Sequence, residues 1–274
     1  MCLFLKVICS LAALYLVPVV FMALVQDRLL FPRWAVGPGA PLPPTAERLA
    51  LHIGPGEQLI GVHLPPVEVL REGSSLVLAF GGNAWNAEDL AMHLHRIFPE
   101  RDIVAFHYRG YTPSTGRPSA RAILQDALAI HDDIAARLSP DRIVVVGLSI
   151  GAGPAAHLAR SRPVAGLVLV TPFDNLRALA REHYPWLPVG LLLRHRMDVA
   201  GDLASVSAPV AVIAAADDTV VPPRRTEAVR LSARNLVAER TIAAAGHNDI
   251  YDRAEFEDAM QTALRRIEVG RDTR

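Results

Sequence analysis

The chain has few residues of the kinds that form covalent or metal-bound frameworks. Its 274 residues include two cysteines, Cys2 and Cys9, and both lie in the apolar N-terminal stretch. The rest of the sequence therefore has no thiol from which to build a disulfide or a reactive thiolate. The ten histidines are scattered, and no Cys/His group has zinc-site spacing, so we expect no metal site.

The chain also lacks an excess of charge of either sign. Lys plus Arg and Asp plus Glu number 28 each, so the formal net charge is zero. Because nucleic-acid binding needs a clustered positive face, we do not expect a nucleic-acid partner. Apolar residues make up 51% of the sequence and charged residues 20%, which is typical of a folded domain. The length suits one large domain with an appendage, or two small domains.

The sequence contains a long apolar run near its N-terminus. Residues 7–25, "VICSLAALYLVPVVFMALV", contain no charge and have about the length of a helix that crosses a bilayer. We therefore predict a single-pass membrane anchor within residues 1–30. A cleaved signal peptide and a core helix are the alternatives; bulky residues follow Ala23, which disfavours cleavage there. Lys6 and Arg28 flank the run and do not decide its orientation.

The remaining sequence has the rhythm of an α/β domain. Residues 31–44 are rich in Pro and Gly and predict a linker. Within residues 45–270, the first two apolar runs are close together like a hairpin, and the others alternate with amphipathic stretches. This pattern predicts a mostly parallel sheet with helices on both faces. The seven runs are "RLALHI", "LIGVHL", "SLVLAF", "DIVAFH", "RIVVVG", "GLVLVT" and "PVAVIAA".

One glycine-rich turn has two interpretations. "GLSIG", residues 147–151, matches G-x-S-x-G, in which Ser149 occupies a strained turn between a strand and a helix. The same region also fits a dinucleotide-binding G-x-G-x-x-A pattern that starts at Gly151, with Asp174 downstream. That fingerprint needs its first glycine where the strand stops, and here the strand stops at Gly147. A nucleophile elbow is therefore the better interpretation.

The partners that a serine nucleophile needs follow in the sequence. A serine hydroxyl requires an imidazole base, and a carboxylate must orient that base. "DDTVVPP" places Asp217 and Asp218 just after an apolar run, and "AAAGHNDI" places His247 before the last helical segment. Nucleophile, acid and base in this chain order are typical of α/β hydrolases. Asp174 remains a rival for the acid, because some hydrolases place it after the preceding strand.

An oxyanion hole requires two backbone N–H groups directed at the developing negative charge. We expect one from Ile150, directly after the nucleophile. The other is expected from Asn83 in "GGNAWN", where glycines let the backbone turn after the run "SLVLAF".

Six segments together resemble one family. "FGGNAWN", "YRGYTPSTGRPS", "GLSIGAG", "HYPWLPVGLLLRHRMD", "DDTVVPP" and "AGHND", with "DRLLFPR" after the apolar run, are similar to the bem-like α/β hydrolases of the abhydrolase-domain group. The resemblance extends from about Asp27 to the final helix. It implies an α/β-hydrolase fold, catalytic Ser149, Asp218 and His247, and oxyanion donors Asn83 and Ile150. Four positions depart from the usual pattern, which bears on the shape of the pocket: Gly81, Trp85, Thr112 and Pro113.

These features predict a membrane-anchored serine hydrolase that cleaves an ester or thioester of a lipid-like acyl substrate without a cofactor. Amide hydrolysis, or a binding protein that retains the fold without turnover, are the alternatives. Residues 172–207 should form a short cap whose apolar residues either pack as core or line an acyl pocket, with Arg194 and Arg196 facing lipid headgroups. The expected pocket residues are Trp85, Trp186 and Leu192.

Overall fold

The computed structural model describes residues 2–67 and 75–269. Within this part of the chain, eight strands form one sheet in the order β1-β2-β4-β3-β5-β6-β7-β8. β2 pairs antiparallel with β1 and β4, and every other neighbouring pair is parallel. The strands are β1 Glu47–Gly54, β2 Glu57–Leu64, β3 Ser75–Phe80, β4 Ile103–Phe106, β5 Arg142–Leu148, β6 Gly166–Val170, β7 Val210–Ala215 and β8 Leu236–Ile242.

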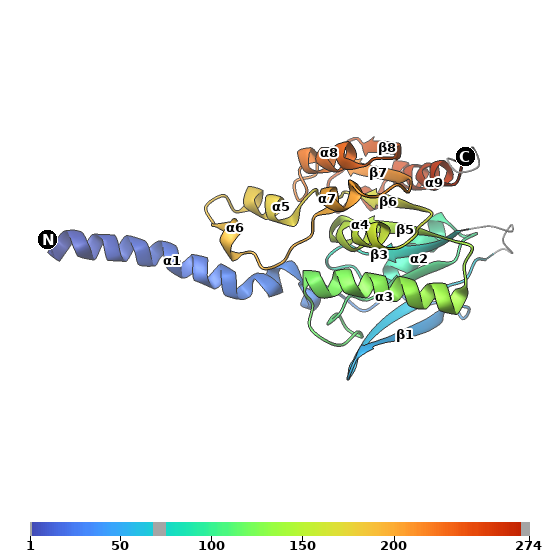
Figure 1. Cartoon of the computed structure of the whole chain (residues 1–274), viewed down its shortest axis with the longest axis horizontal. Coiled ribbons are helices and arrows are strands. Elements are labelled where there is room, and N and C mark those ends of the chain that lie inside the picture. The colour runs from blue at the N-terminus through green and yellow to red at the C-terminus, as the bar shows by residue number, and fades with distance from the viewer. Residues whose placement is uncertain (1, 68–74, 270–274) are drawn as a thin grey trace.

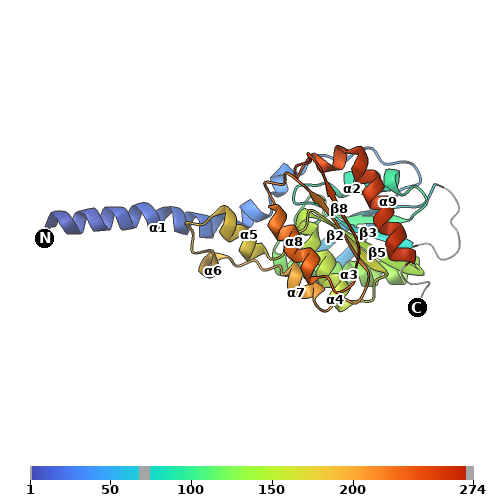
Figure 2. The ribbon, with the colours of Figure 1, turned by 90° about the horizontal axis from the view of Figure 1, so that it is seen from above.

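Helices cover both faces of the sheet (Figure 2). α2 (Ala87–Ile97) and α9 (Ala254–Val269) contribute to the core on one face, and α3 (Ala120–Leu138), α4 (Ala152–Ser161) and α8 (Pro223–Ser232) to the core on the other. Because both faces are covered, β3, β4, β6 and β7 are buried at every position and have continuous apolar sequences. The predicted mostly parallel α/β sheet is confirmed.

The eighth strand, β8, was not among the seven predicted runs. Its sequence, "LVAERTI", places polar residues at exposed positions because it lies at the edge of the sheet. An edge strand needs no continuous apolar run, so the criterion that identifies buried strands does not find it.

The N-terminal helix α1 (Cys2–Leu30) projects from the domain (Figure 1). Its residues Leu3–Leu30 form the one helix of the described chain that is long and apolar enough to cross a membrane, with a hydropathy of 2.5. Signal sequences and core helices meet the same criterion, but only 6% of this candidate span is buried inside the protein. The helix is therefore a candidate membrane anchor.

The segment predicted as a linker is held against the domain. Phe31 is buried, and its ring packs edge-on against His195 with the ring centroids 5.0 Å apart. After a short 3₁₀ turn, η1 (Arg33–Ala35), the backbone carbonyl of Gly37 accepts a hydrogen bond from the Asn86 side chain at 3.0 Å. The residues directly after α1 are consequently packed on the domain. These contacts fix the position of the C-terminal end of α1 relative to the domain.

The cap segment, residues 172–207, contains α5 (Leu176–His183), α6 (Val189–Leu192) and α7 (Val199–Leu203). α7 packs on α4 in the main domain through buried Val199 and Leu203. α5 and α6 extend toward α1, as both Figure 1 and Figure 2 show. The cap therefore lies beside α1.

Candidate active site

Ser149 occupies a tight turn between β5 and α4, at the carboxyl end of the parallel strands. Its backbone φ of 52° lies in the left-handed region, which residues other than glycine rarely adopt. A Cβ on Gly151 would lie 2.1 Å from the Phe80 carbonyl oxygen, and one on Gly147 would lie 2.7 Å from the Ala155 Cβ. Both flanking glycines are thus required by close backbone approaches, as expected for a nucleophile elbow.

The structure brings Ser149, His247 and Asp218 together in a continuous hydrogen-bonded chain. His247 Nε2 lies 2.8 Å from Ser149 Oγ, and His247 Nδ1 lies 2.7 Å from Asp218 Oδ2. An ionised carboxylate only accepts hydrogen bonds, so His247 Nδ1 donates to Asp218, and Nε2 can accept from the serine hydroxyl. The His247 and Asp218 side chains are 8% and 2% exposed, which shields their interaction from water.

The orientation of Asp218 is fixed by the turn that follows β7. Its Oδ1 accepts hydrogen bonds from the backbone N–H groups of Val220 at 2.9 Å and Val221 at 2.7 Å. The second oxygen, Oδ2, is thereby directed at the imidazole.

Neither rival acid interacts with His247. Asp217 is exposed, and Asp174 forms an ion pair with Arg225 at 3.1 Å beside Glu182. Asp174 therefore belongs to an ion-pair cluster that ties the start of the cap segment to α8.

A pocket with an empty volume of about 1300 Å³ opens above Ser149. Asn83, Ile150 and Trp85, all expected at the site, lie in its lining. A Cβ built on Gly82 would lie 3.9 Å from the Ser149 Cβ, so the Gly-Gly-Asn turn after β3 runs beside the serine. In the part of the chain that is described, no group of three His, Cys, Asp or Glu residues is arranged to hold a metal ion.

Two expected pocket residues lie elsewhere. Trp186 is 48% exposed, and Leu192 lines a separate groove beside α1; neither lines the pocket at Ser149. The reason is that the cap residues after α5 are bonded to α1 through the Trp186 and Leu192 carbonyls, so this part of the cap lies beside α1 and away from the serine. The apolar lining nearest the serine on this side comes from the start of the cap, with Phe173, Leu176 and Leu179.

The basic end of the cap contacts the last turn of α1. Arg194, which was expected to face lipid headgroups, is exposed, and its guanidinium donates to Asp27 of α1 at 2.9 Å. The buried neighbour His195 contacts the same carboxylate, with its Nε2 2.8 Å from the oxygen. Only Arg196 of this group is exposed without a contact to α1 in the structure.

Sequence reasoning missed three tyrosines around the site. Tyr108 donates to the Gly81 carbonyl at 2.7 Å, Tyr111 donates to the Asn83 Oδ1 at 3.1 Å, and Tyr251 lines the pocket. Burial raises the pKa of Tyr251 to about 12 and holds the pKa values of Tyr108 and Tyr111 well above their usual range. All three phenols thus remain protonated donors at physiological pH. The conspicuous "YRGY" spacing was the available signal for two of them.

Comparison with known proteins identifies the fold. A family model described as the alpha/beta hydrolase fold matches residues 76–192, which include the elbow and the Gly-Gly-Asn turn. An esterase from Pyrococcus furiosus has the same fold, with a TM-score of 0.65 at 16% identity over 85% of this chain and 97% of that one. The chain has the α/β-hydrolase fold. The order of strands and the elbow after β5 agree with this assignment.

The proteins similar in sequence to this chain include a lipase. An uncharacterised protein of Mycobacterium tuberculosis is 37% identical over 178 residues, covering 63% of each chain. Lysophosphatidylserine lipase ABHD12 of Danio rerio is 30% identical over 168 residues, covering 54% of this chain and 44% of that protein. The chain thus spans less than two thirds of these relatives' length. A membrane phospholipase A described as a bacterial virulence factor has a TM-score of 0.62 at 18% identity, with 97% of both chains covered.

Proposed function

We propose that this chain is a membrane-anchored serine hydrolase that cleaves esters or thioesters of lipid-like acyl substrates. The observation that carries the proposal is the position of His247, which contacts Ser149 Oγ at 2.8 Å and Asp218 Oδ2 at 2.7 Å. This arrangement is that of a nucleophile, a base and an orienting acid. The lipase and phospholipase names of the relatives support a lipid-like substrate.

The reaction follows from the geometry. His247 Nε2 accepts the Ser149 proton as Oγ attacks the acyl carbonyl, and Asp218 stabilises the resulting imidazolium. Backbone N–H groups of Ile150 and Asn83 stabilise the oxyanion of the tetrahedral intermediate. His247 then protonates the leaving group, and the carbonyl–leaving-group bond breaks to give the acyl-serine. Water, deprotonated by His247, releases the acid and restores the serine.

A fluorophosphonate probe tests the nucleophile directly. The wild-type chain should be labelled at Ser149 and hydrolyse p-nitrophenyl butyrate, and Ser149→Ala should abolish labelling and reduce turnover by several orders of magnitude. Full hydrolysis by Ser149→Ala would exclude the serine mechanism. A folded wild-type chain that neither reacts with the probe nor cleaves any ester would favour a binding protein, and cleavage of anilides in preference to esters would favour the amide alternative.

The anchor is tested by fractionation. The uncleaved full chain should pellet with membranes after alkaline carbonate washing, because α1 exposes apolar residues along most of its length. Removal of residues 1–21 should release a soluble enzyme that retains butyrate hydrolysis, since Gln26 and Asp27 still hold the cap. Recovery of the intact chain in the aqueous fraction would contradict the anchor.

A further inference from the structure

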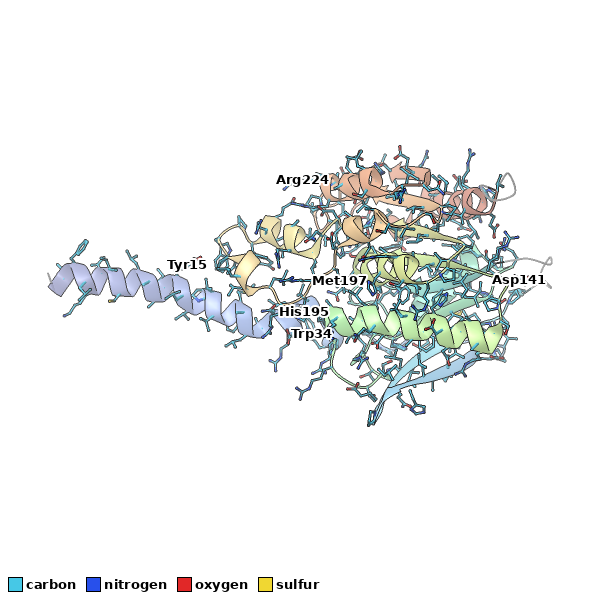
Figure 3. The ribbon with its side chains drawn as sticks, in the orientation of Figure 1. Tyr15, Trp34, Asp141, His195, Met197 and Arg224 are labelled. Atoms are coloured by element: carbon cyan, nitrogen blue, oxygen red, sulfur yellow. The ribbon has the colours of Figure 1, made fainter. Side chains whose placement is uncertain are left out.

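The last turns of α1 are bonded to the cap segment. The side chain of Gln26 donates to the Leu192 carbonyl at 3.1 Å and accepts from the Arg194 N–H at 2.9 Å. Asp27 contacts His195, and the Tyr15 hydroxyl donates to the Trp186 carbonyl at 3.1 Å. Figure 3 shows Tyr15 and His195 along this contact between α1 and the cap. These bonds join residues more than 160 positions apart and fix the two elements side by side.

An apolar groove lies between the bonded elements. We call it the anchor–cap groove; Met22, Leu29 and Leu30 of α1 line one wall, and Tyr184, Leu187 and Leu192 line the other. Its empty volume is about 600 Å³, and almost all of its surface is apolar. An open groove of this composition is unfavourable in water, so it suits an apolar occupant.

The groove adjoins the pocket above Ser149. Leu30 lines both cavities, and the adjacent residues Leu179 and Ala180 line the pocket and the groove respectively. At its other end the groove follows α1 toward the helix turns where apolar side chains such as Leu14 are exposed. Apolar side chains therefore extend from the candidate membrane span to the edge of the pocket that contains Ser149.

We propose that the anchor–cap groove binds the acyl chain of a bilayer-embedded long-chain ester and guides its carbonyl to Ser149. This proposal rests on the proposed serine hydrolase function and assigns α1 a second role as one wall of the substrate site. The occupant is an acyl chain because the lining offers dispersion contacts and almost no hydrogen-bonding groups. Each additional buried methylene should raise kcat/KM by roughly three- to four-fold until the groove is filled.

Bulky substitutions on the two walls test the groove against matched controls. Leu192→Trp and Ala23→Phe place larger side chains in the lining, whereas Leu191 and Leu24 are 89% and 71% exposed neighbours. In the full chain in phosphatidylcholine vesicles, Leu192→Trp and Ala23→Phe should lower kcat/KM for palmitoyl esters at least ten-fold and leave butyryl esters unchanged. Leu191→Trp and Leu24→Phe should change neither. Equal losses of kcat/KM for palmitoyl and butyryl esters would refute the proposed role of the groove. A wild-type kcat/KM for palmitoyl esters no higher than for butyryl esters would also refute it.

A binding measurement separates this proposal from the reaction itself. Ser149→Ala protein in the same vesicles is crosslinked with a diazirine-bearing palmitic acid, and the labelled peptides are mapped. We expect saturable labelling of residues 184–193 that unlabelled palmitate displaces and that adding Leu192→Trp, but not Leu191→Trp, removes. Labelling confined to the outward side of α1 would refute the groove. If the wild-type chain cleaves no ester, the proposed function fails, while the crosslinking still decides whether the groove binds an acyl chain.

A separate observation concerns the turn that carries Asn83. Tyr108 donates to the Gly81 carbonyl at 2.7 Å, and Tyr111 donates to the Asn83 side chain at 3.1 Å. The two rings pack edge-on with centroids 5.8 Å apart. The Gly81 carbonyl shares a peptide unit with the Gly82 N–H, so the Tyr108 bond fixes the peptide plane directly before the one that carries the Asn83 N–H. We infer that Tyr108 and Tyr111 are positioning residues that hold the oxyanion turn in place.

Removing each hydroxyl tests this role. Tyr108→Phe and Tyr111→Phe should each lower kcat for butyryl esters about three- to ten-fold and leave KM unchanged. This factor corresponds to the loss of one net hydrogen bond in the transition state. The affinity for a trifluoromethyl ketone, which forms a tetrahedral adduct with the serine, should fall by the same factor. Tyr15→Phe, which removes a tyrosine bond to a carbonyl far from the site, should leave butyrate turnover unchanged. An effect on KM alone, or wild-type kcat in both variants, would refute the inference.

Discussion

Replacement of Asp218 by Asn gives a quantitative test of the acid. The carboxyl group has two distinct oxygens: Oδ1 accepts from the N–H groups of Val220 and Val221, and Oδ2 faces His247 Nδ1. In Asp218→Asn, the amide oxygen is favoured at the Oδ1 position because two N–H donors point there. The amide NH₂ then faces His247 and forces Nδ1 to accept, so Nε2 carries the proton and cannot take one from Ser149. A base held in the wrong tautomer costs about 10⁴-fold in kcat.

The amide can escape this state by rotating. The rotated amide directs its oxygen at His247 and restores the productive tautomer, but its NH₂ then opposes both backbone N–H groups. Leaving the buried Val221 donor and the partly buried Val220 donor unsatisfied costs about 1–3 kcal/mol each, or roughly 2–6 kcal/mol together. At about 1.4 kcal/mol per factor of ten, the rotated form supports activity roughly 30-fold to 10⁴-fold below the wild type. We therefore expect a loss in kcat between these limits.

The assay compares kcat for p-nitrophenyl butyrate among wild type, Asp218→Asn and Asp217→Asn as full chains in detergent micelles. Asp217→Asn is the matched control, because the same chemical change is made at an exposed neighbour. Thermal unfolding of each variant shows whether the fold is retained. Activity of Asp218→Asn within ten-fold of the wild type, or an equal loss in Asp217→Asn, would refute the assignment of the acid and the reasoning about the tautomer.

Three further predictions concern pH and packing. His63 contacts Glu47 at 3.3 Å and Asp102 at 2.7 Å; burial opposes its charge, but the two carboxylates prevail and raise its pKa. The stability that protonated His63 adds to the folded chain is therefore complete below the unfolded pKa of about 6.5 and is lost as pH rises through the folded pKa. We expect His63→Gln to lower the urea midpoint more at pH 5.5 than at pH 9. An equal loss at both pH values would contradict this. Gly151→Ala should yield little folded protein, because the new Cβ would lie 2.1 Å from the Phe80 carbonyl oxygen, and a soluble, active variant would show that this approach can relax. Burial raises the pKa values of Tyr108, Tyr111 and Tyr251, so in an alkaline titration followed at 295 nm these three phenols should ionise only as the chain unfolds. The stability of the folded chain falls above the unfolded tyrosine pKa of about 10. Ionisation of these tyrosines in the folded chain near pH 10 would count against their burial.

The sheet and the nucleophile turn could be predicted because they depend on near neighbours in the chain. Buried parallel strands require continuous apolar runs, and the strained turn at Ser149 requires Gly147 and Gly151 within two positions. The chain order of the carboxylate and the histidine followed from the alternation of strands and helices. Choosing Asp218 over Asp217 from the sequence depended on the family resemblance, whereas the structure distinguishes them by which carboxyl group contacts His247.

The tertiary structure decided where the apolar surface of the cap is used. A stripe containing Trp186 and Leu192 has the same pattern whether it packs on the core, covers the serine or meets another helix. Its actual neighbour is α1, which precedes it by about 170 residues, and the contact depends on Gln26 reaching backbone groups of the cap. Periodicity reports which face of an element is apolar, but it carries no information about which distant element covers that face. The apolar N-terminal helix was therefore visible in the sequence, and its place beside the pocket at Ser149 was not.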